Sequence, residues 1–384
     1  MDLSYTPEEE AFRARVRAWV EANVPAQGSL KTLDGMRAWQ RKLHAAGFLG
    51  AAWPKEYGGA GLSEMQQAIL NEELARARAP LVVNAMAIWW VGPAIIGYGT
   101  DAQKKRFIPP ILTADEIWAT GYSEPTSGSD MAAARTRAVR DGDVYIVNGQ
   151  KVWTTYAHIS DWFFVLVRTS TEGPKWAGLS LLLMDLRSPG IEIRPIRQID
   201  GSAEFNEVFM TDVRVPVTNL LGREGQGWEV VSSALINERT GIAGSVRFDI
   251  ALDWLATTAR GQGKERDPRV RQRIAELATK AAIVRYAGLR TLTDSLRGRM
   301  NPHLSAAMKL STTQLTQEFS ETAMEVLGPW AALMDDPHAP SNGRWARQYL
   351  GDRSMTIAGG TSEVQRNIVA QRILGLPRDR AVKS

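Results

Sequence analysis

The sequence predicts an α+β fold in which helices come first, strands fill the middle and helices return at the end. Apolar residues recur at helical spacing within residues 1–114, short β-type runs occupy residues 115–222, and helical spacing returns within residues 223–384. Because the strands are grouped between helical blocks, an alternating βαβ sheet is disfavoured. We therefore predict two helical domains on either side of a middle β-barrel or β-sandwich, divided at these boundaries.

The first helix is predicted to begin at Pro7. Residues 6–9, Thr-Pro-Glu-Glu, combine a capping hydroxyl, a proline in the first turn and acids at the positive end of the helix dipole. Phe12 and Val16 then follow at helical spacing, and Pro25 is expected to end the run.

The middle segment contains three clear β-type runs, at residues 144–147, 162–167 and 179–183. Asn148-Gly149 lies between two such runs, and this dipeptide favours a two-residue hairpin turn. We expect a hairpin there. No glycine-rich motif of a Rossmann-type nucleotide site follows a predicted strand, so a dinucleotide would have to bind at a different type of site.

Composition excludes several functional classes. The chain has 384 residues and no cysteine, which rules out disulfides, thiolate metal sites and cysteine nucleophiles. The formal charge of +4 is spread among alternating signs, so no nucleic-acid partner is expected, and the four histidines show no metal-ligand spacing. The N-terminus lacks signal-peptide features, and the apolar stretch at residues 80–96 is too short and interrupted to span a membrane. We expect a cytoplasmic protein without a metal.

Two stretches of the middle segment carry groups suited to a ring-bearing anion. Residues 118–130, Trp-Ala-Thr-Gly-Tyr-Ser-Glu-Pro-Thr-Ser-Gly-Ser-Asp, join a β-type run to a turn whose N–H groups and hydroxyls can face an anion. Residues 148–155, Asn-Gly-Gln-Lys-Val-Trp-Thr-Thr, add an indole and two hydroxyls. Taken alone, the first stretch is equally well an ordinary loop, and Trp153 is more often a core residue.

At this separation the two stretches resemble the flavin-binding middle domain of the acyl-CoA dehydrogenase family, whose motifs are Ser/Thr-Glu-Pro-x-x-Gly-Ser-Asp and Asn-Gly-x-Lys-x-Trp. Further family-like segments stand in family order at residues 53–59, 99–107, 212–216, 221–228 and 360–366. The resemblance covers nearly the whole chain. It implies N-terminal helices, a middle β-barrel and a C-terminal four-helix bundle, with FAD as the cofactor.

The resemblance implies an FAD site residue by residue. Tyr122 and Ser123 match contacts to the flavin pyrimidine edge, and Ser129 matches a hydroxyl near the pyrophosphate. Trp153 matches the indole against the ring system, and Thr155 matches the hydroxyl that donates to flavin N5. The implied FAD contacts are Thr120, Tyr122, Ser123, Gly128, Ser129, Trp153, Thr155, Thr361 and Glu363. Ser129 and Arg239 are the implied substrate contacts.

Thr361 also has a local explanation. It follows Gly359-Gly360 and can cap a helix that ends near Gly375 and Pro377. The free N–H groups of such a helix start favour a phosphate, although an ordinary helix cap has the same sequence features.

Two departures from the family pattern concern the adenosine half of FAD. Many members place an Arg and, two residues later, a Phe beyond the first long bundle helix, where they reach the neighbouring subunit's FAD. Residues 260–264 here read Arg-Gly-Gln-Gly-Lys, without Phe. A family Gln appears as Glu325, and a family glycine appears as Pro329. How the adenosine half is held is therefore open.

The catalytic base is predicted to be Glu238. Removing the α proton of a thioester requires a carboxylate kept from water. Most straight-chain members place it directly before the last Gly-Thr, where this chain has Gly359. A minority, including isovaleryl-CoA dehydrogenase and bacterial enzymes for steroid or dicarboxylic acyl groups, supply it from the first bundle helix before an Arg, and residues 237–239 here read Asn-Glu-Arg.

Helical spacing supports this choice. Val231, Leu235 and Ile242 form an apolar stripe, and Glu238 lies within it at intervals of three and four residues. The alternative is a structural ion pair, for which Arg239 is not the partner because adjacent helical residues do not face each other.

The resemblance implies an acyl-CoA dehydrogenase of fatty acid metabolism that forms a trans-2-enoyl-CoA. The base takes the α proton, a hydride passes from the β carbon to flavin N5, and electrons go to electron-transfer flavoprotein. The expected assembly is a homodimer or homotetramer. One alternative is a non-catalytic or co-dependent subunit of a heterotetramer, and a minor alternative is an acyl-CoA oxidase. The resemblance does not determine the acyl group, although the position of the base favours branched or bulky chains.

Overall fold

The computed structural model describes residues 5–26, 28–236 and 242–377. The chain divides into two compact units that are not contiguous in sequence. The helical unit comprises the described parts of Met1–Ala22, Glu64–Arg78 and Arg239–Ser384, and the sheet unit comprises those of Asn23–Ser63 and Ala79–Glu238. The predicted division into 1–114, 115–222 and 223–384 follows chain order instead, and stays a prediction.

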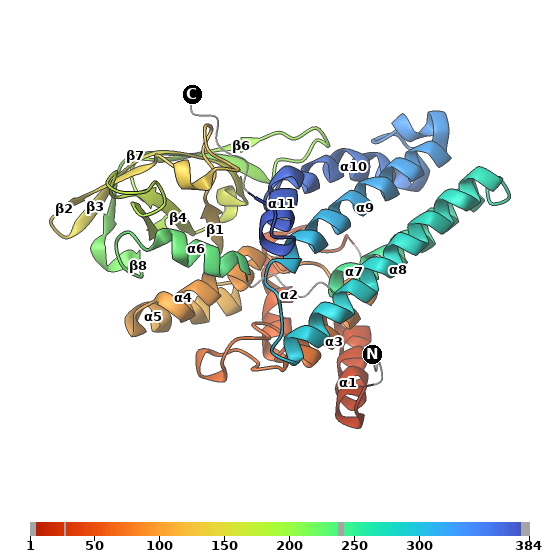
Figure 1. The fold of residues 1–384 in the computed structure, drawn as a ribbon, viewed down its shortest axis with the longest axis horizontal. Coiled ribbons are helices and arrows are strands. Elements are labelled where there is room, and N and C mark those ends of the chain that lie inside the picture. Colours follow the sequence, from red (N-terminus) through yellow and green to blue (C-terminus); the bar gives the residue numbers. More distant parts are fainter. Residues whose placement is uncertain (1–4, 27, 237–241, 378–384) are drawn as a thin grey trace. The chain divides into compact units, whose positions relative to one another are not determined.

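The helical unit is built from seven described α-helices. They are α1 (Pro7–Asn23), α3 (Glu64–Arg76), α7 (Ile242–Gly261), α8 (Pro268–Leu296), α9 (Leu304–Leu327), α10 (Arg344–Gly351) and α11 (Ser362–Ile368). The long helices α8 and α9 run beside each other (Figure 1). Their core includes a stacked pair, Phe248 of α7 and Phe319 of α9, with ring centroids 5.6 Å apart.

The start of α1 is as predicted. The Thr6 amide donates to Glu9 Oε2 at 2.8 Å, and the Glu9 amide donates to Thr6 Oγ1 at 3.3 Å, which is a capping box. Phe12 and Val16 are buried, and α1 ends at Asn23 before Pro25. The predicted helical periodicity is thereby confirmed.

A buried carboxylate lies in the short helix Asp352–Thr356 that follows α10. Asp352 is 8% exposed, and one of its oxygens, Oδ2, has no hydrogen-bond partner among the described residues. Burial raises the pKa of Asp352 to about 6, against hydrogen bonds from Ser320 and Gln348 and the nearby charges of Arg353 and Arg247. The charged carboxylate is therefore a cost in the folded state at neutral pH.

We expect Asp352→Asn to stabilise the protein more as pH rises from about 4 to about 6. The folded pKa lies above the unfolded value, so the folded state binds more protons in this window, and the parent loses stability as pH rises through it. At about 1.4 kcal/mol per pKa unit, the gain over the parent reaches about 2–3 kcal/mol near pH 7. Urea unfolding of both proteins at pH 4.5 and 7 measures it. A difference that does not change with pH would contradict this prediction.

The sheet unit contains one mixed sheet of eight described strands. They are β1 (Trp118–Gly121), β2 (Arg137–Asp141), β3 (Val144–Thr155), β4 (Trp162–Arg168), β5 (Leu179–Asp185), β6 (Ile191–Ile196), β7 (Phe205–Pro216) and β8 (Leu220–Leu221). The order is β6-β7-β3-β2-β4-β5-β8, with β1 parallel to β4. Every described strand falls within the predicted range of residues 115–222, and side chains of most strands meet in one core, as expected of a sheet that curls on itself.

The predicted hairpin at Asn148-Gly149 is wrong. Strand β3 continues through this dipeptide and pairs with β7, with a register shift between Val147 and Gly149. Asn148 Nδ2 donates to Asp212 Oδ1, and the Asp212 amide donates to Asn148 Oδ1, both at 2.9 Å. A Cβ on Gly149 would lie 2.6 Å from Thr136 Oγ1, so glycine serves close strand packing here. The actual β2–β3 turn contains Gly142, whose φ is +60°.

The described α-helices of this unit are α2 (Leu33–Ala45), α4 (Gly92–Tyr98), α5 (Asp101–Thr113) and α6 (Gly227–Ile236). Buried Asn84 connects α5 to β1, because its Nδ2 donates to the carbonyls of Ile111 and Glu116 and its Oδ1 accepts from the Trp118 amide. Asn84 also interrupts the apolar stretch at residues 80–96. Within the described residues, no helix has both the length and the apolar character needed to cross a membrane.

Candidate functional site

The two sequence motifs of the middle segment meet in the sheet unit. The first motif runs along β1 and into the turn after it, and the second motif lies on β3. The Val152 amide donates to the Ser123 carbonyl at 3.0 Å, which joins them directly. Residues separated by about 30 positions in the chain thus form one surface of Thr120, Tyr122, Ser123, Trp153 and Thr155.

A buried ion pair lies beneath this surface. Lys151 Nζ lies 2.8 Å from Glu124 Oε1, with side chains 0% and 5% exposed. The ammonium also donates to the Tyr122 carbonyl at 3.2 Å. Glu124 accepts two further hydrogen bonds, from the amides of Arg135 and Thr136 at 2.6 and 2.8 Å. Both buried charges therefore have hydrogen-bond partners besides each other, as a buried ion pair requires.

The pKa values of the pair reflect both burial and attraction. Burial lowers the pKa of Lys151 to about 8, against the attraction of the Glu124 carboxylate. For Glu124 burial acts upward, but the Lys151 charge and the amide hydrogen bonds outweigh it and hold the pKa below its usual value. Both groups are charged at neutral pH, so they hold Tyr122 and the neighbouring chain in one position.

Trp153, two residues after Lys151 on β3, adopts an uncommon backbone conformation. Its φ is +60°, and the β3–β7 register shifts between Lys151 and Thr154. Such a bulge turns a side chain out of the normal alternation. The indole is 58% exposed and touches Phe205 edge-on, with centroids 6.2 Å apart. A flat apolar face is thus presented to the outside at a backbone position that side chains rarely adopt.

The polar groups of this surface are not used inside the protein. Across the described parts of the chain, the hydroxyls of Thr120, Ser123, Ser129 and Thr155 form no hydrogen bond to another residue, and the buried Tyr122 hydroxyl is also unpaired. Burial raises the pKa of Tyr122, which keeps it a neutral donor. Donors beside an exposed indole suit a polar, flat ring, so these residues fit the flavin of FAD. Their roles stay predictions.

Thr361 and Glu363 belong to the helical unit. Thr361 caps α11 as predicted, because its Oγ1 accepts from the Val364 amide at 3.2 Å. Hydrogen bonds from its own backbone amide and from the Thr361 hydroxyl lower the pKa of Glu363. Gly360 is held by Lys309 Nζ, which donates to its carbonyl at 2.6 Å. The cap is formed, while the predicted FAD contacts of these two residues stay predictions.

We expect Gly359→Ala to be milder than Gly360→Ala. Their φ angles are +66° and +91°, so either alanine should lower the free energy of unfolding by about 1–2 kcal/mol, because an L-residue is disfavoured in a left-handed conformation. A Cβ on Gly359 meets nothing within 4 Å, whereas a Cβ on Gly360 would lie 2.6 Å from Gln365 Nε2. That amide hydrogen-bonds the Gly359 carbonyl and would have to move. Urea unfolding of the two variants checks the order, and equal losses would contradict it.

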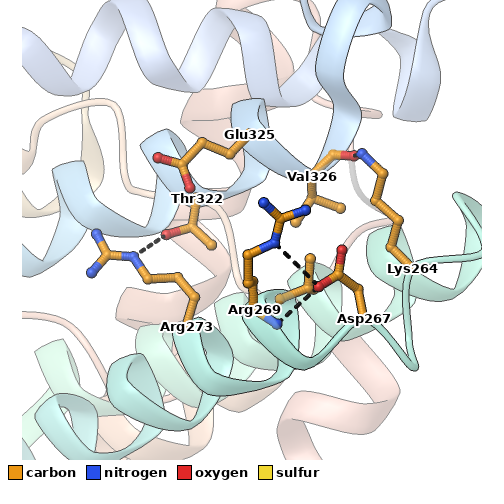
Figure 2. Close-up of a pocket in the computed structure, with 8 residues that line it drawn as sticks. Lys264, Asp267, Arg269, Arg273, Thr322, Glu325 and Val326 are labelled. Atoms are coloured by element: carbon orange, nitrogen blue, oxygen red, sulfur yellow. Dashed lines mark hydrogen bonds and ion pairs between the residues drawn. The ribbon is translucent and has the colours of Figure 1, made fainter.

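Two of the residues in the segments that depart from the family pattern, Lys264 and Glu325, line one cavity of about 290 Å³ in the helical unit. Figure 2 shows Lys264 reaching it from the turn before α8 and Glu325 from α9. Lys264 Nζ donates to the Val326 carbonyl at 2.7 Å, and Arg273 Nε donates to Thr322 Oγ1 at 3.2 Å.

The described residues that line this cavity fit a stacked purine poorly. They are Lys264, Asp267, Arg269, Val270, Arg273, Thr322, Glu325 and Val326. Five carry charge, and none is aromatic, so no flat apolar wall is available for an adenine ring. Lys264 and Glu325 add charge to this cavity, whereas Gln262 and Pro329 are not among its lining residues, so how the adenosine half of FAD is held stays open.

The predicted base Glu238 and the predicted substrate contact Arg239 lie outside the described residues. The nearest described helices are α6, which ends at Ile236, and α7, which begins at Ile242. Val231 on the predicted apolar stripe is fully buried.

Sequence reasoning missed the Lys151–Glu124 pair. Both residues stood in the motifs, but nothing local linked them across 27 positions. A usable indication was the lysine itself, because Lys151 directly precedes the apolar Val152 and Trp153, and a lysine that becomes buried needs a partner.

Comparisons with known proteins bear on the whole chain. Three family models match in order: the acyl-CoA dehydrogenase N-terminal domain over residues 6–115, the middle domain over residues 119–213 and the C-terminal domain over residues 225–374. Acyl-CoA dehydrogenase IpdE1 of Mycobacterium tuberculosis is 40% identical over 383 residues, covering 96% of this chain and 98% of that protein. Acyl-CoA dehydrogenase FadE26 of the same organism is 35% identical, covering 98% and 99%.

Solved structures agree. The ChsE4-ChsE5 complex from Mycobacterium tuberculosis has a chain similar to this one, with a TM-score of 0.87 and 34% identity over 99% of this chain and 100% of that one. A chain of the Tcur3481-Tcur3483 steroid ACAD gives a TM-score of 0.88 and 30% identity, with coverage of 99% and 100%. The predicted fold class, the FAD cofactor and an oxidoreductase acting on CH–CH donors are confirmed by these matches. This chain belongs to the acyl-CoA dehydrogenase family.

Proposed function

We propose that this chain removes an α proton and a β hydrogen from an acyl-CoA thioester, forms a trans-2-enoyl-CoA and passes the electrons to electron-transfer flavoprotein. The observation that carries the proposal is that the two joined motifs on β1 and β3 carry hydroxyls without a partner in the described chain together with an exposed indole. FAD, when bound there, supplies the two-electron acceptor.

The residues of the sheet unit bind and orient the cofactor in this proposal. Trp153 covers one face of the ring system, and Thr155 and Ser123 donate hydrogen bonds to its polar edge. The buried Lys151–Glu124 pair keeps the two motifs in register, because neither charge can leave its partner without a large desolvation cost. Ser129 lies at the pyrophosphate side of the same turn and also contacts the substrate.

Glu238 is the proposed base. A carboxylate is required near the α carbon, and Gly359, at the position where straight-chain members carry it, has no proton acceptor. Arg239, the next residue, is the proposed substrate contact. A carboxylate on a largely apolar stripe is shielded from water, and this raises its proton affinity, as removal of the α proton requires.

The acyl group is proposed to be bulky and ring-bearing. Two points support this: the proposed base Glu238 stands at the sequence position that members acting on branched or bulky chains use, and one structure at 30% identity is a steroid ACAD. Fatty acyl chains are the alternative substrate class.

The test is anaerobic titration of the purified holoenzyme with ring-bearing and straight-chain acyl-CoA thioesters while the flavin absorbance is recorded. We expect stoichiometric bleaching by a ring-bearing thioester, and then faster reoxidation by electron-transfer flavoprotein than by oxygen. A shielded reduced flavin suppresses the oxygen reaction. Peroxide formed at the rate of substrate oxidation would instead identify an oxidase.

A second candidate is a co-dependent subunit of a heterotetramer. The specific observation in its favour is the charged cavity at Lys264 and Glu325, which lacks an aromatic wall among its described lining residues. A solved relative at 34% identity is part of the ChsE4-ChsE5 complex. The chain purified alone should be yellow if it is self-sufficient. A colourless protein that takes up FAD only with a second chain would establish the co-dependent subunit.

A further inference from the structure

The turn before α10 has an uncommon backbone. Ser341, Asn342 and Gly343 follow one another with φ angles of +52°, +54° and +69°. A left-handed conformation costs an L-residue roughly 1–2 kcal/mol, so two non-glycine residues in succession represent stored strain. Strain of this kind persists only where surrounding contacts enforce it, and it is concentrated at functional positions.

Two sets of contacts enforce this turn. A Cβ on Gly343 would lie 1.9 Å from the Met334 carbonyl oxygen, so only glycine fits. The Arg347 guanidinium donates to the carbonyls of Asn342 at 2.6 Å and Met334 at 3.0 Å, and it pairs with Asp335. The first residue of α10, Arg344, is therefore presented in a defined place.

The first turn of α10 is fastened to α7. Trp345 is buried, and its Nε1 donates to Thr258 Oγ1 at 2.9 Å. The Thr258 hydroxyl in turn donates to the Trp254 carbonyl at 2.8 Å. With both helices fixed, the guanidinium carbon of Arg344 lies 3.0 Å from the centroid of the Trp254 ring.

A second arginine faces the same indole. The guanidinium carbon of Arg78, at the end of the segment that carries α3, lies 4.6 Å from the Trp254 centroid. Both distances are measured to one centroid, so the two guanidinium carbons are separated by at most their sum. Neither arginine forms an ion pair with a carboxylate of the described chain, unlike Arg13, Arg17 and Arg353.

This arrangement brings two like charges together without an anion. Burial, with a further contribution from the Arg78 charge, lowers the pKa of Arg344 to about 10. An indole face attracts a guanidinium by roughly 0.5–2 kcal/mol, but it does not neutralise charge. An oxyanion bound by the two guanidinium groups would neutralise this charge and accept several N–H hydrogen bonds at once.

We propose that Arg78, Arg344 and Trp254 form a binding site for an oxyanion, a phosphate or carboxylate group, supplied by a small molecule or by a carboxylate side chain of a second subunit. None of the three is a predicted FAD or substrate contact. Trp254 serves as the platform that holds both arginines, and the strained turn holds Arg344 in position. The site stands independently of the proposed dehydrogenase mechanism.

The test measures the melting temperature of the holoenzyme in inorganic phosphate and in chloride at equal ionic strength. We expect phosphate to raise the melting temperature of the parent by about 2–4 °C, since ligand binding to the folded state stabilises it. Arg344→Met and Arg78→Met should both lose this rise, because methionine keeps aliphatic contact with the indole but has no N–H groups. Arg290→Met, which removes a charge with a side chain 82% exposed, is the matched control and should keep it.

Sedimentation of the same proteins separates the two sources of the anion. If phosphate has no effect on the parent but Arg344→Met weakens the oligomer while Arg290→Met does not, a carboxylate of a second subunit fills the site. If phosphate stabilises parent and variants equally, or changes neither stability nor assembly, the proposal is overturned. Arg78→Met keeps the test valid if Arg344→Met fails to fold, because Arg78 is exposed.

Discussion

Glu238→Gln should abolish flavin reduction while leaving FAD and substrate binding intact. The amide keeps the size and hydrogen-bonding ability of the side chain but has no basic lone pair for the α proton. Loss of a general base costs about 10²–10⁴-fold in rate, and loss of the only base in a shielded site falls at the upper end. Anaerobic flavin bleaching in a single turnover measures the chemical step directly.

The matched control is Glu229→Gln, a change of the same chemistry at an exposed position of α6. It should reduce its flavin at the parent rate. A companion Glu238→Gln/Gly359→Glu variant is expected to regain part of the activity, with straight-chain thioesters preferred, because a Cβ on Gly359 meets nothing within 4 Å. If Glu238→Gln bleaches as fast as the parent, the base lies elsewhere. If no thioester bleaches the parent, the co-dependent subunit is the better description.

Lys151→Met should be the most destabilising of the substitutions considered for the sheet unit. It leaves the Glu124 carboxylate buried without its cation, and breaking a buried pair from one side costs about 3–5 kcal/mol. Tyr122 and Ser123 then lose their fixed position, so the variant should also release FAD more readily. Urea unfolding and flavin retention on gel filtration measure the two effects.

An exposed pair in the same unit provides the control. Lys175 pairs with Asp130, with side chains 59% and 56% exposed, so Lys175→Met should cost no more than about 1 kcal/mol. The double variant Lys151→Met/Glu124→Gln should recover part of the loss, because no buried charge remains and the amide oxygen still accepts from the Arg135 or Thr136 amide. A Lys151→Met variant as stable as Lys175→Met would show that the buried pair is dispensable.

The sequence by itself determined the features that depend on neighbours along the chain. The helix caps at Thr6 and Thr361 were predicted because a cap joins residues only three positions apart. Helical and β-type periodicity likewise placed the strands within residues 115–222. The two flavin motifs were visible because each is a continuous stretch, and they led to the family that the comparisons establish.

The wrong hairpin prediction at Asn148-Gly149 shows that a local turn preference can be overridden by tertiary contacts. The dipeptide favours a tight turn, but pairing of β3 with β7 and the Asn148–Asp212 hydrogen bonds keep the strand extended. Strand pairing stabilises the fold through hydrogen bonds and side-chain contacts along the whole ladder, whereas the turn preference of one dipeptide contributes little free energy. Where a local conformational preference and tertiary contacts disagree, the tertiary contacts therefore decide the conformation.

Only the tertiary structure decided which charges meet. The residues next to Lys151 in the chain do not indicate Glu124 as its partner, and those next to Arg344 do not indicate that it and Arg78 both contact the Trp254 ring. The meeting of Lys264 and Glu325 in one cavity was equally hidden. Electrostatic and cation–π energies depend on distance and burial in space, and the fold sets these independently of sequence separation.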